Sequence, residues 1–179
     1  MKLELKVMFQ DEARFGRISE GKKCWSPRKK RPIVKSQIIR EYTYLYGAFS
    51  PKNGESEFLI LPYMNSQCMS IFLDTISKNN PNKLILMVTD NASCHTSSQL
   101  KIPINIKLLP LPPYSPELNP SENMWGEIRE KFFHNFTFDS MESLENCVVK
   151  ACNYYFENKN IIKSVTNFKW IKKIFLKAN

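Results

Sequence analysis

The chain opens with apolar side chains at every second position, which is the pattern of a strand with one covered face. Residues 3–9 follow this alternation, and two acids, Asp11 and Glu12, come directly after it. We therefore expect the first strand to end at these acids. Two runs rich in Tyr, Leu and Phe, residues 42–49 and 57–62, flank a Pro and Asn-Gly turn at 50–54, which predicts a β-hairpin.

The period then changes from two to about 3.6 residues. Residues 65–77 place apolar side chains at helical spacing behind Asn65, a plausible cap. Residues 83–89 form a continuous apolar run of strand length, and 102–109 form a second short strand, with a short helix expected between them. Two helices are predicted to follow.

The first of these helices begins at Asn119-Pro120, with Asn as cap and Pro in the first turn, and the second begins at Asp139. Strands first, followed by alternating strands and helices, predict an α/β fold, a mixed central sheet flanked by helices. The length of 179 residues and the 42% hydrophobic content fit one domain with a real core.

Charge is concentrated in one stretch of the sequence. The chain has 26 Lys and Arg against 17 Asp and Glu, a net charge of +9. The segment 14–40 holds ten basic residues and one acid, so it accounts for the whole excess. Pro27 and Pro32 interrupt it, which predicts a long loop or hairpin. Localised positive charge favours a polyanionic partner, although a solvated, solubilising loop is the alternative. We expect the DNA contacts at Lys22, Lys23, Arg28, Lys29, Lys30 and Arg31.

Other classes of protein fit poorly. The apolar runs are too short to cross a bilayer, so no membrane association is expected, and the N-terminus lacks a secretory signal pattern. Five cysteines without a C-x-x-C spacing argue against a disulfide framework or a zinc ribbon and favour a reducing compartment. The five glycines form no phosphate-binding loop.

Three acids stand where α/β proteins gather functional groups. Asp11 and Asp90 each follow a predicted strand, and Glu122 lies in the first turn of a predicted helix. If the two strands are parallel neighbours, their acids meet at one edge of the sheet. Crowded carboxylates are the ligands that two Mg²⁺ or Mn²⁺ ions need for phosphoryl transfer.

Each acid also has a purely structural interpretation. Asp11 could open a turn, and Asp90 could form an Asx turn. Glu122 lies three residues after Asn119, where a capping-box glutamate belongs, and local chemistry alone favours that cap. His95 is expected to support Asp90 or to face DNA, because adjacent Cys94 and His95 rarely form a catalytic pair. Trp25 could stack on a base or belong to the core.

Three motifs carry a family resemblance: FQDEARF at 9–15, VTDNASCH at 88–95 and LPPYSPELNPSENMW at 111–125. In this order they resemble the acidic motifs of DDE transposases of the mariner superfamily, most closely the insertion-sequence-630 type. The resemblance extends from about residue 3 to about residue 171.

The resemblance implies a ribonuclease-H-like catalytic domain in which Asp11, Asp90 and Glu122 hold two Mg²⁺ or Mn²⁺ ions, whereas Glu117 is not catalytic. It implies a DNA endonuclease and strand transferase acting on element ends and on target DNA at a TA step, and a homodimer assembled on DNA. In relatives, the region corresponding to 16–39 can clamp a partner subunit and touch DNA.

We therefore expect residues 1–179 to form a single catalytic domain, without the N-terminal helix-turn-helix domain that the family usually carries. An engineered truncation, one frame of a split element and a decayed remnant all fit this expectation. A bacterial, cytoplasmic, nucleoid-associated location is the corresponding expectation. Two other functions stay open: a catalytically silent DNA-binding or oligomerisation module, and a different ribonuclease-H-fold nuclease.

Overall fold

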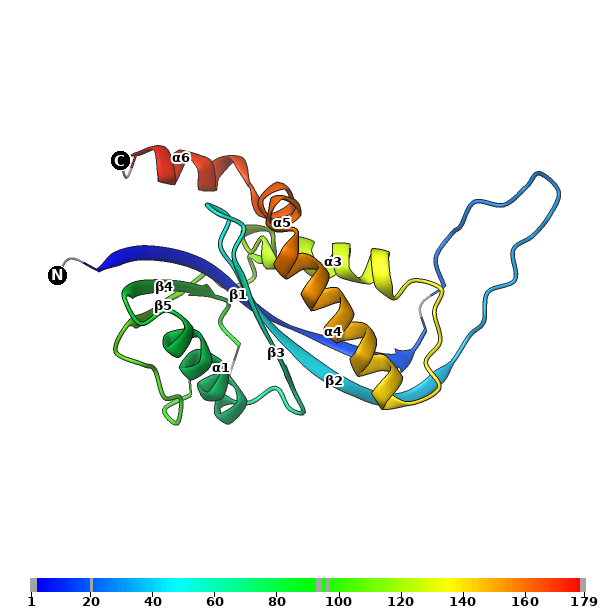
Figure 1. Ribbon diagram of the computed structural model, residues 1–179, viewed down its shortest axis with the longest axis horizontal. Helices are drawn as coiled ribbons and strands as arrows, with labels where there is room; N and C mark the ends of the chain where they lie inside the picture. The colour runs from blue at the N-terminus through cyan, green and yellow to red at the C-terminus, as the bar shows by residue number, and fades with distance from the viewer. Residues whose placement is uncertain (1–2, 20, 93–94, 96, 178–179) are drawn as a thin grey trace.

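A mixed five-stranded sheet forms the centre of the protein (Figure 1). The computed structural model describes residues 3–19, 21–92, 95 and 97–177, and the sheet order is β3-β2-β1-β4-β5. The strands are β1 (Glu4–Ile18), β2 (Ile38–Phe49), β3 (Ser56–Leu61), β4 (Lys83–Thr89) and β5 (Ile106–Pro110); the helices are α1 (Ser66–Asn79), α3 (Ser121–Phe132), α4 (Met141–Glu157), α5 (Lys159–Thr166) and α6 (Lys169–Lys177), with a 3₁₀ turn η1 (Pro116–Leu118).

Helices cover both faces of the sheet, so the predicted α/β class is confirmed. On one face, α1 packs against β1, β2 and β4 through Phe72, Leu73 and Ile76, which are fully buried. On the other face, α3, α4 and α5 enclose a second core around Trp125 and Tyr155. In α4, Leu144, Val148, Ala151 and Tyr155 are all buried.

Strand β1 is longer than the sequence pattern predicted. It continues through Asp11 and Glu12 to Ile18 and stays paired with β2 over that length. The expected end of the strand at the two acids is therefore wrong. The alternation in fact persists, because Asp11 occupies an inward position between Phe9 and Ala13, all three of them buried.

The two neighbours of β1 pair with it in different ways. β2 runs antiparallel along most of its length, whereas β4 runs parallel and pairs only from Glu4↔Lys83 to Phe9↔Val88. After Phe9, the edge of β1 that faces away from β2 has no strand partner in the described part of the chain. We call this stretch, residues 10–18, the open edge of β1.

The other predicted elements are largely confirmed. β2 and β3 form the antiparallel hairpin, and Asn65 caps α1 by accepting a hydrogen bond from the Cys68 amide. The expected strand at 102–109 is shorter and begins at Ile106. The short helix expected before it falls partly on residues 93, 94 and 96, which lie outside the described residues.

The sequence pattern did not predict the last two helices. α5 and α6 follow α4, and Ile171 of α6 packs on Phe9 and Val88, so α6 covers the beginning of β1 and the end of β4. The helices of the described part of the chain are all too short or too polar to span a membrane.

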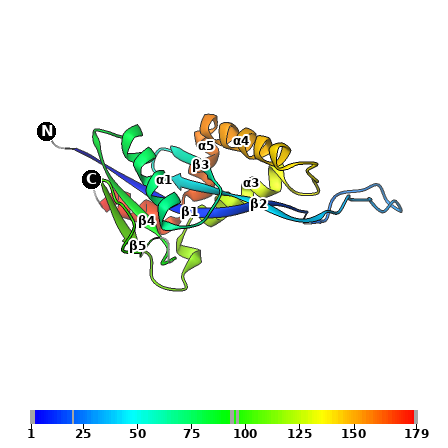
Figure 2. The ribbon, with the colours of Figure 1, turned by 90° about the horizontal axis from the view of Figure 1, so that it is seen from below.

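A long projection connects β1 and β2. Figures 1 and 2 show that it extends away from the sheet and the helices. We call residues 19–37 the arm. Its base is fixed, because Gln37 exchanges two hydrogen bonds with the backbone of Phe138 and the Ser19 amide donates to the Gln37 carbonyl. The predicted loop over 14–40 is thus shorter, since both of its ends belong to strands.

Candidate active site

The three predicted acids line one cavity. Asp11 from β1, Asp90 from the end of β4 and Glu122 from the first turn of α3 border a space of about 240 Å³, which Tyr114 and Asn119 also line. The sheet brings Asp11 and Asp90 together because β1 and β4 are parallel neighbours. Helix α3 is fixed there by Ser121, whose hydroxyl donates to the Phe9 carbonyl.

Asp11 is held in place by a tryptophan. The carboxyl is buried, with 8% of the residue exposed, and its Oδ2 accepts a 2.9 Å hydrogen bond from Trp125 Nε1. Opposite Asp11 on β2 lies Gly47. A Cβ at this glycine would stand 2.5 Å from the Trp125 ring, so the missing side chain leaves the space through which the indole reaches Asp11.

The electrostatics of Asp11 differ from those of an ordinary carboxyl. Its pKa is raised to about 7, first because the group is buried and second because the negative charge of Glu122 lies nearby; the hydrogen bond from Trp125 acts in the opposite direction. No Lys, Arg or His of the described residues lies within ion-pair distance of Asp11 or Glu122. Asp11 and Glu122 therefore bring negative charge to the cavity that no basic side chain of the described residues compensates.

Asp90 has a different environment. It is half exposed, and its Oδ1 lies 2.8 Å from His95 Nδ1 and accepts a 2.9 Å hydrogen bond from the Ala92 amide. The hydrogen bond from His95 holds the pKa of Asp90 below its ordinary value, although partial burial acts in the opposite direction. The Asx-turn interpretation and the expected support by His95 are both correct here, because one oxygen makes both contacts.

His95 in turn rests on a buried glutamate. Its Nε2 lies 3.1 Å from Glu12 Oε1, and both side chains are only 2% exposed. Gln10 Nε2 donates to the same Glu12 oxygen at 3.0 Å. A chain of polar contacts thus runs from β1 through His95 to Asp90, and it fixes the acid at the end of β4. Cys94 lies outside the described residues.

Glu122 is exposed and does not form the expected capping box. The cap of α3 is Pro120, without a side-chain cap bond, and Asn119 uses its Oδ1 to accept from the Ser121 amide. The Glu122 amide donates to the Asn119 carbonyl at 3.2 Å, so the helix start is stabilised by the backbone. The side chain of Glu122 is therefore left to the cavity and the solvent.

The acids border one space but do not form a closed coordination sphere. Among the described residues, no group of three or more His, Cys, Asp or Glu side chains is drawn together tightly enough to hold a metal ion. What the fold provides is three carboxylates that line one cavity.

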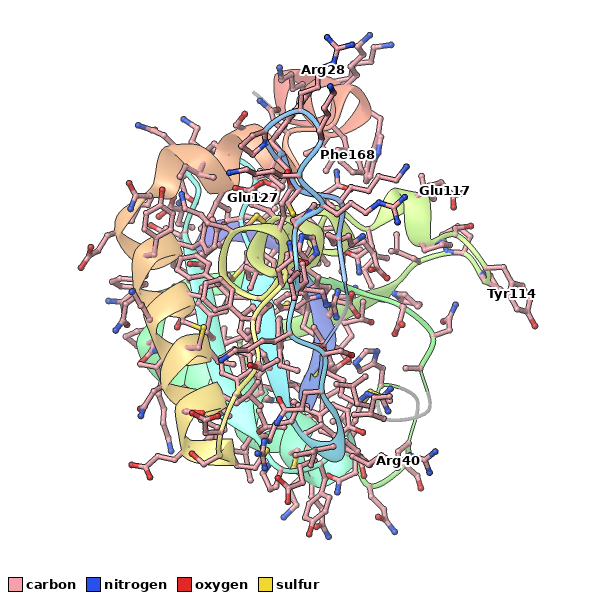
Figure 3. The ribbon with its side chains drawn as sticks, turned by 90° about the vertical axis from the view of Figure 1, so that its right-hand side faces the viewer. Arg28, Arg40, Tyr114, Glu117, Glu127 and Phe168 are labelled. Atoms are coloured by element: carbon pink, nitrogen blue, oxygen red, sulfur yellow. The ribbon has the colours of Figure 1, made fainter. Side chains whose placement is uncertain are left out.

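The residues expected to bind DNA all lie on the arm. They are exposed and far from the core, and Figure 3 shows Arg28 at the tip and Arg40 near the base. Trp25 is fully exposed, which rules out the core interpretation of this residue. Among the described residues, none from the arm lines the acid cavity.

Sequence reasoning missed two residues that build the site, Trp125 and Glu12. Trp125 belongs to the third motif and lies three positions after Glu122, on the same side of the helix, so spacing could have indicated it. Glu12 gave no such indication, because in an isolated strand it points away from Asp11.

We predict that His95→Ala lowers the free energy of unfolding by about 2 kcal/mol, because it removes hydrogen bonds to two carboxylates, one of them buried. Urea denaturation at pH 7 would measure the change. His134→Ala is the matched control, since the His134 side chain makes no hydrogen bond with the described residues; it should change stability by less than about 0.5 kcal/mol. Equal losses in the two variants would contradict the positioning role of His95.

Comparison with known proteins gives the family. Residues 6–145 match the model of the DDE superfamily endonuclease family. A Sinorhizobium fredii (strain NBRC 101917 / NGR234) protein, "Uncharacterized protein y4pE/y4sA", is 32% identical over 130 residues, which cover 72% of this chain and 96% of that protein. The transposable element Tc3 transposase of Caenorhabditis elegans is 28% identical over 177 residues, covering 89% of this chain and 53% of the transposase.

The fold has solved counterparts. The Mos1 mariner paired end complex with Mn superposes with a TM-score of 0.64 at 17% identity, over 90% of this chain and 54% of that one. The chain thus spans about half the length of the Tc3 and Mos1 proteins. The ribonuclease-H-like architecture expected from the three motifs is confirmed by this likeness. Because the family model covers most of its residues, the chain belongs to the DDE superfamily endonucleases, as a catalytic domain of the transposase type.

Proposed function

We propose that this chain cleaves and transfers DNA strands with the help of two divalent cations, Mg²⁺ or Mn²⁺, held by Asp11, Asp90 and Glu122. One observation carries the proposal: three carboxylates from three separate elements line a single cavity, and the buried one stands beside another acid without a basic partner. Mos1 transposase complexes have been solved with Mn, with Mg and with a left transposon end, and we extend these partners to this chain.

The residues present fit such a cation site. Carboxylate oxygens are the ligands that Mg²⁺ and Mn²⁺ prefer. The pKa of Asp11 is raised to about 7 because its charge is buried beside that of Glu122, and a bound cation would compensate this charge. On Asp90, Oδ1 is occupied by His95 and the Ala92 amide, which leaves Oδ2 for a cation.

Bound cations supply activation of the attacking oxygen and stabilisation of the leaving oxygen of a phosphodiester. The side chains of the protein hold the carboxylates in position. Trp125 fixes Asp11 from the side of α3, and His95 fixes Asp90 from the side of Glu12. Both acids are thus oriented by neighbours before any ligand arrives, which lowers the cost of assembling the site.

The DNA partner follows from the same family and from charge. The exposed basic residues of the arm suit contacts with the phosphate backbone, which give affinity without sequence information. The substrates we propose are the ends of the element and the target DNA. We propose also that two copies of this chain form a dimer on that DNA.

Plasmid nicking tests the proposal. The chain is incubated with supercoiled plasmid in Mg²⁺, in Mn²⁺ or in EDTA, and binding of Mn²⁺ to the free chain is followed by calorimetry. We expect nicked circles with either cation and none in EDTA. DNA binding without nicking, together with no measurable Mn²⁺ binding, would contradict the proposal and favour a catalytically silent DNA-binding module.

A further inference from the structure

Three arginines gather beside the open edge of β1, next to the acid cavity but distinct from it. Arg14 from β1, Arg40 from β2 and Arg129 from α3 line a cavity of about 560 Å³ together with Tyr42 and Glu41. These positions are 26 and 89 residues apart in sequence and meet only through the fold. We call this group the arginine cluster.

The cluster differs from a structural arginine close by. Arg17 pairs with Glu41 at 2.6 Å and donates to the carbonyls of Phe138 and Asp139, so its charge is compensated. In the described part of the chain no carboxylate lies within ion-pair distance of the three cluster guanidinium groups. Their charge is therefore available to a ligand.

Two of the guanidinium groups are nevertheless held in place. Arg14 lies over the Tyr42 ring at 5.0 Å, and Arg129 lies over the Phe15 ring at 5.2 Å. Arg129 also donates a long hydrogen bond of 3.5 Å to the Arg14 carbonyl, on the open edge. Stacking on an aromatic face leaves the N–H donors of the fork free, which is the arrangement that suits phosphate oxygens.

The distance from the acids to the cluster can be estimated along β1 and along α3. β1 and α3 run side by side in the same direction, as the contacts of Trp125 with Asp11 and of Arg129 with Arg14 require. At about 3.3 Å per strand residue, the backbone of Arg14 lies about 10 Å beyond that of Asp11, and the Arg14 side chain points to the other face of β1. At about 1.5 Å per helix residue, Arg129 lies about 10 Å beyond Glu122.

A DNA strand carries a phosphate at every nucleotide. A strand whose phosphodiester lies at the acid cavity therefore presents further phosphates to side chains about 10 Å away. Arg40 also lies near the base of the arm, three positions after residue 37 (Figure 3). The cluster thus occupies the stretch between the acids and the arm.

We infer that the arginine cluster binds backbone phosphates of the DNA strand whose phosphodiester lies at the acid cavity. The inference rests on the proposed function, since it takes the acid cavity as the place of cleavage. It assigns phosphate binding to residues of the rigid sheet and helix, in addition to the basic residues of the arm.

The test measures the salt dependence of DNA binding. A fluorescent 30-base-pair duplex is titrated with the full chain in EDTA at several KCl concentrations, and the slope of log K against log salt is determined. Each phosphate contact contributes about 0.9 to this slope. We expect the triple variant R14Q/R40Q/R129Q to lose about 2 to 3 from the slope and at least about tenfold in affinity at 0.1 M salt.

The control removes the same number of charges elsewhere. Lys52, Lys78 and Lys150 are exposed on other parts of the molecule, and K52Q/K78Q/K150Q should keep the wild-type slope. Thermal melting by circular dichroism confirms that both variants fold. Equal loss of slope in the two variants, or no loss in the arginine variant, would overturn the inference.

A second readout separates this inference from the proposed function. Nicking of plasmid in Mn²⁺ depends on the acids, whereas the slope in EDTA does not. If wild type fails to nick but the arginine variant loses slope, the metal mechanism fails and phosphate binding stands. If wild type nicks and the slope is unchanged in the arginine variant, metal-dependent cleavage stands and phosphate binding by the arginine cluster fails.

Discussion

Glu122→Gln is expected to lower the rate of Mn²⁺-dependent plasmid nicking by at least about 1,000-fold, which corresponds to about 4 kcal/mol of lost transition-state stabilisation. Glutamine keeps the shape of the side chain but removes the charge that a cation needs. Glu122 is exposed and makes no cap bond through its side chain, so folding should be unchanged. DNA binding in EDTA should be equal or tighter, because one negative charge is removed beside the proposed DNA path.

Glu117 provides the matched control. It is an exposed acid of the same motif, in η1, five positions before Glu122, and it does not line the acid cavity. Glu117→Gln should keep the nicking rate within about twofold. Wild-type nicking by the Glu122 variant, or an equal loss in the Glu117 variant, would remove Glu122 from the site.

Asp11→Asn is expected to stabilise the cation-free chain increasingly as the pH rises. The carboxyl has an ordinary pKa of 3.8, and in the folded chain its pKa is about 7. Between these values the folded state binds a proton that the unfolded state has released, so the free energy of unfolding falls as the pH rises through this window. The contribution of the protonated carboxyl is present below about pH 4 and is lost above about pH 7.

Urea denaturation in EDTA at pH 4.5 and pH 8 would measure this effect. The stability of Asp11→Asn relative to wild type should rise by about 2–3 kcal/mol between the two pH values, because one pKa unit corresponds to about 1.4 kcal/mol. Adding Mn²⁺ at pH 8 should stabilise the wild type and leave the variant unchanged. A difference between the Asp11 variant and wild type that stays the same at both pH values would contradict the assigned pKa.

The sequence was sufficient to place Asp90 but misjudged the position of Asp11. A continuous apolar run ends directly before Asp90, and the structure ends β4 at Thr89. For Asp11, the acids appeared to interrupt the alternation, whereas Asp11 in fact replaces an apolar residue on the inward face of a strand that continues to Ile18. An acid on an inward position therefore indicated a site and not the end of a strand.

Of the contacts that orient the acids, the sequence predicted the support of Asp90 by His95 but not the two that connect distant parts of the chain. Trp125 reaches Asp11 over 114 positions, and His95 reaches Glu12 over 83. Neither contact has a periodic pattern, since each depends on which strands become neighbours. The arginine cluster has the same origin. The charge count singled out the segment 14–40, which holds Arg14 and Arg40, whereas Arg129 belongs to a helix with no excess of positive charge around it. Packing of α3 along β1 is what makes it part of a basic surface.

The long separation between Asp11 and Trp125 also has a consequence during synthesis. A ribosome adds about 5–20 residues per second, so the 114 positions between them take about 6–23 s to make. Throughout that interval the acid of β1 exists without the helix that carries Trp125, Glu122 and Arg129. The nascent chain can therefore present its basic arm to DNA well before it has assembled the centre that we propose cuts it.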